Sequence, residues 1–317
     1  MVHNLQEWWK SLRAIHTKWV LRSWSCFCGR PSTVTAGDRG RCESRPTPTI
    51  RGKTETSLGG ASSLSPAPSA DARAARVTLE RLLDAEAPEI AATLPPGFAD
   101  AVERYVALLL EANLRLNLTR VTEPDAVARL HLLDSLSALP LLDSIAPSAA
   151  LDLGSGGGVP GLILALARPD IRWTLVDSVG KKCDAMRGFA DALGLGSVAV
   201  IAERAEILGR DPRHRERYDI VTARACASMP VLVEYALPLI RAGGSLLAWK
   251  GALTADDDEI RTGAAAAQLM GGGTPSIHGA GMGSLGTHRL VVVEKDRATP
   301  AGYPRRPGEP ARRPLAH

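Results

Sequence analysis

The stretch Ala150-Leu-Asp-Leu-Gly-Ser-Gly-Gly-Gly-Val-Pro-Gly161 combines a short apolar strand, a glycine-rich turn and the start of a helix. We expect the strand from Ala149 to Leu153 and the helix from Pro160 onward. Glycine is needed where the backbone takes positive φ or lets a ligand approach it closely. The first turn of the following helix carries unpaired N–H groups and a partial positive charge. The stretch therefore predicts a strand–loop–helix unit that holds a ligand against bare backbone.

Two classes of ligand fit this loop. Gly156, Gly158 and Gly161 match the dinucleotide fingerprint, but one match of that kind is not specific. The wider pattern, with Asp152 two residues before Gly154, resembles motif I of S-adenosylmethionine-dependent methyltransferases. That ligand is cationic at its amino-acid end, which suits a carboxylate beside the loop. We favour adenosylmethionine over a dinucleotide and over a purely structural turn.

Strands and helices alternate after residue 149, which predicts a parallel α/β sheet. Further strands are expected at 172–177, 198–201, 218–222, 244–249 and 288–294, with helices at 181–193, 229–240 and 256–270. This order predicts the class I, Rossmann-like sheet of an adenosylmethionine-dependent methyltransferase over 146–296. Before it, the amphipathic stretch Phe98–Leu116 and apolar segments at 77–83 and 131–142 predict an N-terminal helical cap over 77–145.

Ligands of such sheets lie at the carboxyl ends of the strands. Asp177 ends the second strand there, where a carboxylate accepts hydrogen bonds from ribose hydroxyls or serves as a helix N-cap. Ala205 and Glu206 follow the third strand, where a small residue leaves room for an adenine ring. Arg224 ends the otherwise apolar fourth strand and needs a carboxylate, a phosphate or a base as its partner. Asp152, Gly156 and Asp177 are thus candidate cofactor-binding residues.

Bulk composition limits the classes of partner. The 317 residues carry a net charge of +4, but residues 1–76 contribute 12 basic against 5 acidic side chains. The remainder is slightly acidic, so any nucleic-acid binding must use a local basic patch. The five cysteines have no zinc-ligand spacing, which predicts free thiols and no metal site. No apolar run approaches the length of a membrane span.

The two ends of the chain differ from its middle. Residues 1–76 are predicted to be disordered or a spurious extension from a misplaced start, with a targeting peptide or an RNA- or membrane-surface arm as alternatives. The tail 297–317 is rich in proline and arginine, with five Arg and one Glu. It is either a solvated terminus or an arm that contacts phosphate.

Several short motifs, in this order, resemble one family over about residues 80–315. They are Asn117-Leu-Thr, His131-Leu-Leu-Asp-Ser135, the glycine loop, Leu175-Val-Asp-Ser178, Arg204-Ala-Glu206, Arg224-Ala-Cys-Ala-Ser228, Lys250-Gly251 and the tail Tyr303-Pro-Arg-Arg-Pro-Gly308. Together they resemble the bacterial small-subunit rRNA guanine-N7 methyltransferase family, also called the glucose-inhibited division protein B family. Two positions depart from the family: Ala112-Asn113 stands in place of Trp-Asn, and Leu130 separates Arg129 from His131.

The resemblance implies transfer of a methyl group from S-adenosylmethionine to N7 of one guanine in 16S rRNA, on naked rRNA or the 30S subunit. It places Gly154, Val159, Ala205, Glu206 and Arg224 at cofactor-contacting positions. It also implies a cytoplasmic enzyme, and we expect a monomer. Guanine N7 carries a free lone pair, so no general base is expected, and Arg224 has at most an orienting role.

Contacts with RNA are expected from a set of polar and basic residues: Asn117, His131, Lys181, Lys182, Arg187, Arg305 and Arg306. Solvated surface charge is an equal interpretation for the lysines and arginines. His131 and Asp134 are candidates for a hydrogen-bonded pair near the pocket mouth. Three alternatives remain open: a non-catalytic RNA-binding module, a methyltransferase for another acceptor, and an NAD-dependent oxidoreductase, for which the chain after Trp249 is short.

Overall fold

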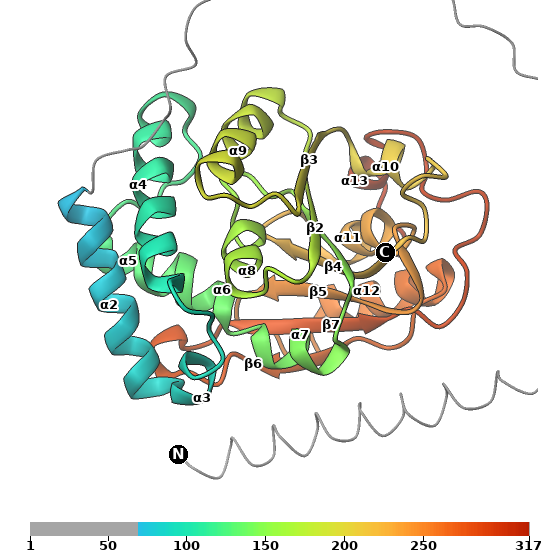
Figure 1. The fold of residues 1–317 in the computed structure, drawn as a ribbon. Helices are drawn as coiled ribbons and strands as arrows, with labels where there is room; N and C mark the ends of the chain where they lie inside the picture. The colour runs from blue at the N-terminus through green and yellow to red at the C-terminus, as the bar shows by residue number, and fades with distance from the viewer. Residues whose placement is uncertain (1–68, 317) are drawn as a thin grey trace, which may run out of the picture.

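The computed structural model describes residues 69–316, and the segments 1–68 and 317 lie outside the described residues. Its centre is a seven-stranded sheet in the order β3-β2-β1-β4-β5-β7-β6 (Figure 1). β1 to β5 run parallel, whereas β7 pairs antiparallel with both β5 and β6. The predicted class I methyltransferase sheet is confirmed. Its strands are β1 (Ala149–Leu153), β2 (Arg172–Asp177), β3 (Val198–Ala202), β4 (Tyr218–Arg224), β5 (Ile240–Lys250), β6 (Ser276–Gly279) and β7 (Arg289–Glu294).

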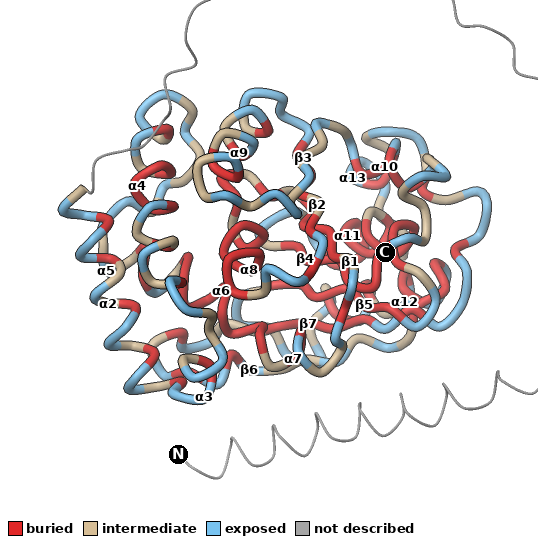
Figure 2. The backbone as a smooth tube through the Cα atoms, viewed as in Figure 1, coloured by how far each residue is buried: buried red, intermediate tan, exposed pale blue. Residues whose placement is uncertain are grey.

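Helices cover both faces of the sheet and create two apolar layers. Successive side chains of a strand point to opposite faces, so Ala150 of β1 joins one layer and Leu151 the other. Figure 2 shows the buried residues concentrated along the sheet and the inner sides of the helices. The first layer contains α8 (Gly161–Ala167), α9 (Gly180–Ala192) and the cap; the second contains α10 (Ala205–Leu208), α11 (Met229–Ala236) and α12 (Asp258–Met270).

The N-terminal cap forms the blue-to-green end of the molecule in Figure 1. Its first helix begins before the predicted start at Val77. Ser69 caps this helix by accepting the Ala72 N–H, and the side chains of Ala72 and Ala75 are fully buried. The prediction that the disordered or spurious extension reaches residue 76 is therefore wrong for residues 70–76, which form part of a packed helix. The rest of the predicted extension, residues 1–68, lies outside the described residues. The cap comprises α2 (Ala70–Glu86), α3 (Pro88–Ala91), α4 (Phe98–Leu116), α5 (Pro124–Val127), η1 (Ala128–Leu133), α6 (Asp134–Leu136) and α7 (Leu139–Ile145).

The segment predicted as one helix over 131–142 is divided into three pieces. It begins with the π-helical turn η1, continues as α6, and resumes as α7 after a turn. Ser135 Oγ donates to the His131 carbonyl oxygen at 2.5 Å, and Ser137 Oγ donates to the Asp134 carbonyl oxygen at 2.7 Å. Hydroxyls that bond to carbonyls one turn back compete with regular helix. π-Helical turns are frequent at functional sites.

The last part of the sheet differs most from the prediction. α11 ends at Ala236, and β5 begins at Ile240, inside the segment predicted as helix. β6 was not predicted, because its four residues hold a single large apolar side chain, Ile277, which is too few for a recognisable pattern. It forms by pairing with β7, in the register Ile277 with Val291. Tertiary pairing therefore decides this region, as is common for strands. Among residues 69–316, no helix is long and apolar enough to cross a membrane.

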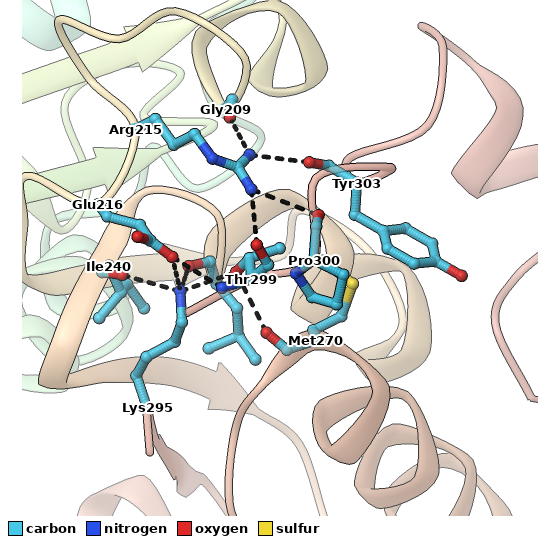
Figure 3. A network of polar contacts seen from close by, with 10 residues as sticks. Gly209, Arg215, Glu216, Ile240, Met270, Lys295, Thr299, Pro300 and Tyr303 are labelled. Carbon is cyan, nitrogen blue, oxygen red and sulfur yellow. Dashed lines mark hydrogen bonds and ion pairs between the residues drawn. The ribbon is translucent and has the colours of Figure 1, made fainter. Parts of the chain in front are cut away.

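The C-terminal segment folds back on the domain, and α13 (Glu309–Arg312) ends it. Arg215 donates through its guanidinium to the carbonyl oxygens of Thr299 at 2.9 Å and Tyr303 at 2.8 Å (Figure 3). Arg210 donates to the carbonyl oxygen of Pro304 at 2.7 Å. Neither interpretation of the tail, as a solvated terminus or as a free phosphate-contacting arm, describes this packed segment.

A buried lysine ties the tail to β7. Lys295 Nζ donates to the carbonyl oxygen of Ile240 at 2.9 Å, to Thr299 Oγ1 at 2.7 Å and to the Glu216 carboxylate at 3.2 Å (Figure 3). Its side chain is fully buried. Burial lowers the pKa of Lys295 from 10.5 to about 8, since removal from water disfavours the charged amine.

The lysine makes stability depend on pH. Between about pH 8 and 10.5 the unfolded state binds a proton that the folded state has released, so this group's contribution to stability rises with pH. We expect the loss of unfolding free energy caused by Lys295→Met to grow by on the order of 1–3 kcal/mol across that interval. Urea unfolding of both proteins at several pH values measures this. A difference that is independent of pH would show that the amine keeps its ordinary pKa in the folded state.

Candidate functional site

The glycine loop after β1 is held in shape by its own hydrogen bonds. The N–H groups of Gly154 and Ser155 both donate to the carbonyl oxygen of Val176 in β2, at 2.8 and 3.0 Å. Gly154 has φ +73°, and a Cβ there would lie 3.1 Å from Cys226 Sγ. Gly156 has φ +56° and faces open space, because a Cβ there would meet only one atom, at 3.9 Å. The loop therefore presents bare backbone at the carboxyl edge of the sheet, as predicted.

Asp152 does not face this open side. One carboxylate oxygen accepts the N–H of Gly161 at 3.1 Å, and the other accepts the hydroxyl of Thr222 in β4 at 2.8 Å. The residue is fully buried, and burial raises its pKa to about 6. The prediction that Asp152 meets the cationic end of a ligand is therefore wrong. Its carboxylate instead fixes the start of α8 to β1 and β4, beneath the loop.

Asp177 holds the loop from the neighbouring strand. One carboxylate oxygen accepts the N–H of Gly156 at 3.0 Å, and the other accepts the N–H of Val179 at 2.9 Å, just before α9. Asp177 therefore holds the residue before α9, much as the capping interpretation predicted, and it lies beside the loop where the other interpretation placed a ligand. Each carboxylate oxygen has a second lone pair, so these two bonds leave capacity for a hydroxyl donor at the edge of the sheet.

Ala205 and Glu206 open α10 after β3, at the same edge. Ala205 is small and nearly buried, and the first N–H groups of a helix have no partner within it. The Glu206 carboxylate is buried and accepts the N–H of Gly308 in the tail at 2.7 Å. The carboxylate of Glu206 therefore anchors the tail, whereas the backbone here and the Ala205 side chain remain suited to a flat ring.

Arg224 points from the end of β4 into the cap. Its Nη1 donates to Asp134 at 2.9 Å and to the carbonyl oxygen of Leu130. Its Nη2 donates to His131 Nδ1 at 3.0 Å. Of the three partners considered from the sequence, a carboxylate is the one found. Arg224 consequently joins the sheet edge to the π-helical turn of the cap, with its side chain one-fifth exposed.

His131 and Asp134 do not bond to each other, contrary to the predicted pair. The guanidinium of Arg224 only donates, so Nδ1 of His131 must accept and Nε2 must carry the proton. That proton is directed to Thr119 Oγ1, at 2.7 Å. Burial, and then the charge of Arg224, lower the pKa of His131 to about 4, so its ring is neutral near pH 7. His131 therefore orients Arg224 rather than lying free for RNA.

These residues fit an adenosylmethionine molecule at the ends of β1, β2 and β3. Gly154, Gly156 and Val159 are half-buried and lie on the loop. Asp177 is the last residue of β2, and Ala205 begins the helix after β3. The loop offers backbone to a ligand without phosphate, Asp177 offers a carboxylate to hydroxyls, and Ala205 leaves space for a ring.

The comparison with known families agrees with this geometry. A sequence profile described as rRNA small subunit methyltransferase G matches residues 99–285, more than half of the chain. The chain belongs to this family. A ribosomal RNA small subunit methyltransferase G from Moorella thermoacetica is 38% identical over 237 residues, which cover 74% of this chain and 98% of that protein.

A second relative supports membership of the methyltransferase G family. The protein of the same name from Roseiflexus castenholzii is 46% identical over 213 residues, covering 67% of this chain and 89% of its own. Among solved structures, an O-methyltransferase from Bacillus cereus aligns with a TM-score of 0.45 and 17% identity, over 68% of this chain and 100% of that one.

The residues proposed for RNA contact in this methyltransferase G chain are not equivalent. Lys181 and Asn117 are exposed and Lys182 is half-buried, all near the ends of α9 and α4. Arg187 is exposed but donates to Asp184 at 2.7 Å and to the carbonyl oxygen of Val200 at 3.1 Å.

The two tail arginines also differ. Arg306 is exposed. Arg305 forms a bidentate pair with the fully buried Glu234, with distances of 2.6 to 3.1 Å. Arg305 is thus paired within the protein, and its contact with phosphate stays a prediction.

Sequence reasoning missed several residues that build the site. Thr222 completes the clamp around Asp152, and Tyr105 of the cap donates to the Gly157 carbonyl oxygen of the loop at 3.0 Å. His288 Nδ1 lies 2.9 Å from Asp134 Oδ1, whereas the sequence predicts His288 only as the first residue of a strand. Tyr105 could have been suspected, because a buried tyrosine hydroxyl needs a partner. The other two gave no local signal.

Proposed function

We propose that this protein transfers a methyl group from S-adenosylmethionine to N7 of a single guanine in 16S rRNA of the small ribosomal subunit. Membership of the methyltransferase G family is the observation that carries the proposal. The open glycine loop, the Asp177 carboxylate and the small Ala205 along one sheet edge support the choice of cofactor. We further propose that the enzyme is a cytoplasmic monomer and that residues 1–68 are dispensable for activity.

The main task of the protein in this reaction is to align the methyl donor with guanine N7. Bound adenosylmethionine would supply an electrophilic methyl group. Guanine N7 has a free lone pair at neutral pH, so the chain needs no general base to activate it. Correct positioning of two reactants can supply roughly 7–11 kcal/mol of the barrier. The glycine loop and Asp177 would fix one reactant, and the cap would help to hold the acceptor base, which must be unstacked to enter the site.

Methyl transfer tests the proposal directly. Full-length protein and the fragment 69–317 would be incubated with labelled adenosylmethionine and small-subunit particles from cells that lack the modification. Incorporation at one N7-methylguanine by both proteins is the expected result. Asp177→Ala should weaken cofactor binding in calorimetry by 10-fold or more (about 1.4 kcal/mol). Asp191→Ala, at an exposed aspartate on α9, should leave cofactor binding unchanged.

The alternatives predict other results. Cofactor binding without turnover on any acceptor would favour the non-catalytic RNA-binding module. Transfer to a different nucleotide or to a protein would keep the methyltransferase and replace the acceptor. Activity of the full chain alone would show that residues 1–68 form a needed arm.

A further inference from the structure

The carboxyl edge of the sheet is divided at the boundary between β1 and β4. The chain winds from β1 through β2 and β3 on one side and from β4 onward on the other, and ligands of such sheets lie at this switch point. The residues that fit adenosylmethionine, which are Gly154, Gly156, Val159, Asp177 and Ala205, all belong to the first side. The second side presents Arg224 at the end of β4, Lys250 at the end of β5, and His288 and Arg289 where β7 begins. Lys250 and Arg289 face each other in the sheet register.

Two of these basic groups are already engaged within the protein. Lys250 Nζ donates to Glu259 at 2.6 Å and to the Ala227 carbonyl oxygen at 2.7 Å. Arg224 is held by the cap. His288 differs, because its side chain is about one-third exposed (35%) and, among residues 69–316, only its Nδ1 is bonded, to Asp134 at 2.9 Å. A carboxylate oxygen only accepts, so Nδ1 carries a proton and Nε2 is the ring nitrogen left for a partner.

Asp134 is built to hold this imidazole. Its side chain is buried, with 3% exposed, and its two carboxylate oxygens divide between Arg224 and His288. Its backbone carbonyl oxygen accepts the indole N–H of Trp249 from β5, at 2.8 Å. One residue of the cap therefore fixes side chains from β4 and β7 together.

We propose that His288 contacts the RNA acceptor through Nε2, and that Asp134 is the positioning residue that fixes its ring. The inference rests on the proposed function and names a residue of the acceptor half of that same site. Nε2 of this ring accepts, so a hydrogen bond to it from a guanine N–H or a ribose hydroxyl would orient the acceptor toward the loop side of the edge. Loss of a hydrogen bond that leaves a desolvated donor without a partner lowers binding or rate by roughly 10- to 100-fold.

Two substitutions separate contact with RNA from a structural role. Asn at 288 keeps a donor near the position of Nδ1 and removes Nε2, whereas Gln places a polar atom near Nε2. We expect His288→Asn to lower kcat/KM for small-subunit particles by 10-fold or more, and His288→Gln to stay within about 3-fold of wild type. Adenosylmethionine affinity should not change in either. His278→Asn, on the neighbouring strand β6, is the matched control and should retain full activity.

The opposite pattern overturns the inference. If Asn retains activity and Gln loses it, His288 serves only as a partner of Asp134. If both variants equal wild type, His288 contacts nothing that matters to transfer. Failure of the wild-type protein to methylate any particle would count against the proposed function instead. Asp134→Asn should reproduce the loss seen in His288→Asn, and the double variant should lose less than the sum of the single losses.

A measurement on the unaltered protein keeps the test decisive if a variant misfolds. Diethylpyrocarbonate modifies accessible imidazole nitrogens, and mass spectrometry locates the modified residue. Saturating unmodified particles should protect His288 several-fold, whereas His214, which is bonded to Tyr218 at the opposite end of β4, should react equally with and without particles. Equal modification of His288 in both samples would refute the contact.

Discussion

Replacing Arg305 with alanine is expected to lower the free energy of unfolding by about 3–5 kcal/mol, because it leaves a buried carboxylate without its charge partner. Glu234 on α11 is fully buried, and the Arg305 guanidinium occupies both of its oxygens. The backbone N–H of Arg305 donates to the same carboxylate at 2.8 Å. This backbone hydrogen bond remains in the Arg305→Ala variant, but it does not neutralise the charge of the Glu234 carboxylate.

The neighbouring Arg306 offers the matched control, because it is exposed. Arg306→Ala should change stability by less than about 0.5 kcal/mol. Urea unfolding measures both effects, and filter binding to RNA at several salt concentrations shows whether either arginine contacts phosphate. A phosphate contact would reduce the slope of log affinity against log salt by somewhat under 1. A reduced slope with unchanged stability for Arg305→Ala would restore the phosphate-contact role and refute the structural one.

The fold was readable from the sequence where local pattern and tertiary structure agree. The glycine loop and the alternating strands after Ala149 predicted the sheet, because buried parallel strands are short apolar runs that need helical crossovers. The pattern failed at β6, which pairs with β7, and at the start of β5, where Ile240 pairs with Tyr218 of β4. It also missed the start of α2, since alanines give little periodic signal although Ala72 and Ala75 are fully buried.

The site was less readable, because most of its polar groups find partners far along the chain. Arg224 bonds to Asp134, ninety residues earlier, and Glu206 bonds to Gly308, in the tail. The sequence identifies each as a polar group that needs a partner but does not say which one. Charge alone therefore suggested RNA contact for Arg305, which is paired internally. The backbone conformation of the loop was predicted correctly, because its glycines indicate the positive φ angles that it adopts, while contact of its residues with a cofactor stays a prediction.

Asp152 provides the second large expected effect. Asp152→Ala should lower the free energy of unfolding by about 3 kcal/mol, since it leaves the Gly161 N–H without a partner, removes the nearer acceptor of the Thr222 hydroxyl and opens a cavity. Adenosylmethionine affinity should fall by 10-fold or more, because α8 and the loop lose their link to the sheet.

Asp152→Asn should keep affinity within about 3-fold of wild type (below roughly 0.7 kcal/mol), as an amide can accept from Gly161 and donate to Thr222. The hydroxyl of Thr222 can then donate to the Leu151 carbonyl oxygen, now 3.5 Å away.

The pH dependence of stability tests the burial of Asp152, and the cofactor affinity of the Asn variant separates the clamp from direct contact with the cofactor. Burial raises the pKa of Asp152 to about 6, so between about pH 4 and 6 the folded state keeps a proton that the unfolded state has released. This group's contribution to wild-type stability therefore falls as pH rises through that interval. Asp152→Asn lacks this loss, so its stability relative to wild type should increase by on the order of 1–3 kcal/mol from pH 4 to 7. If Asp152 instead bound the cationic end of the cofactor, Asn would weaken affinity as much as Ala does, because the amide carries no charge.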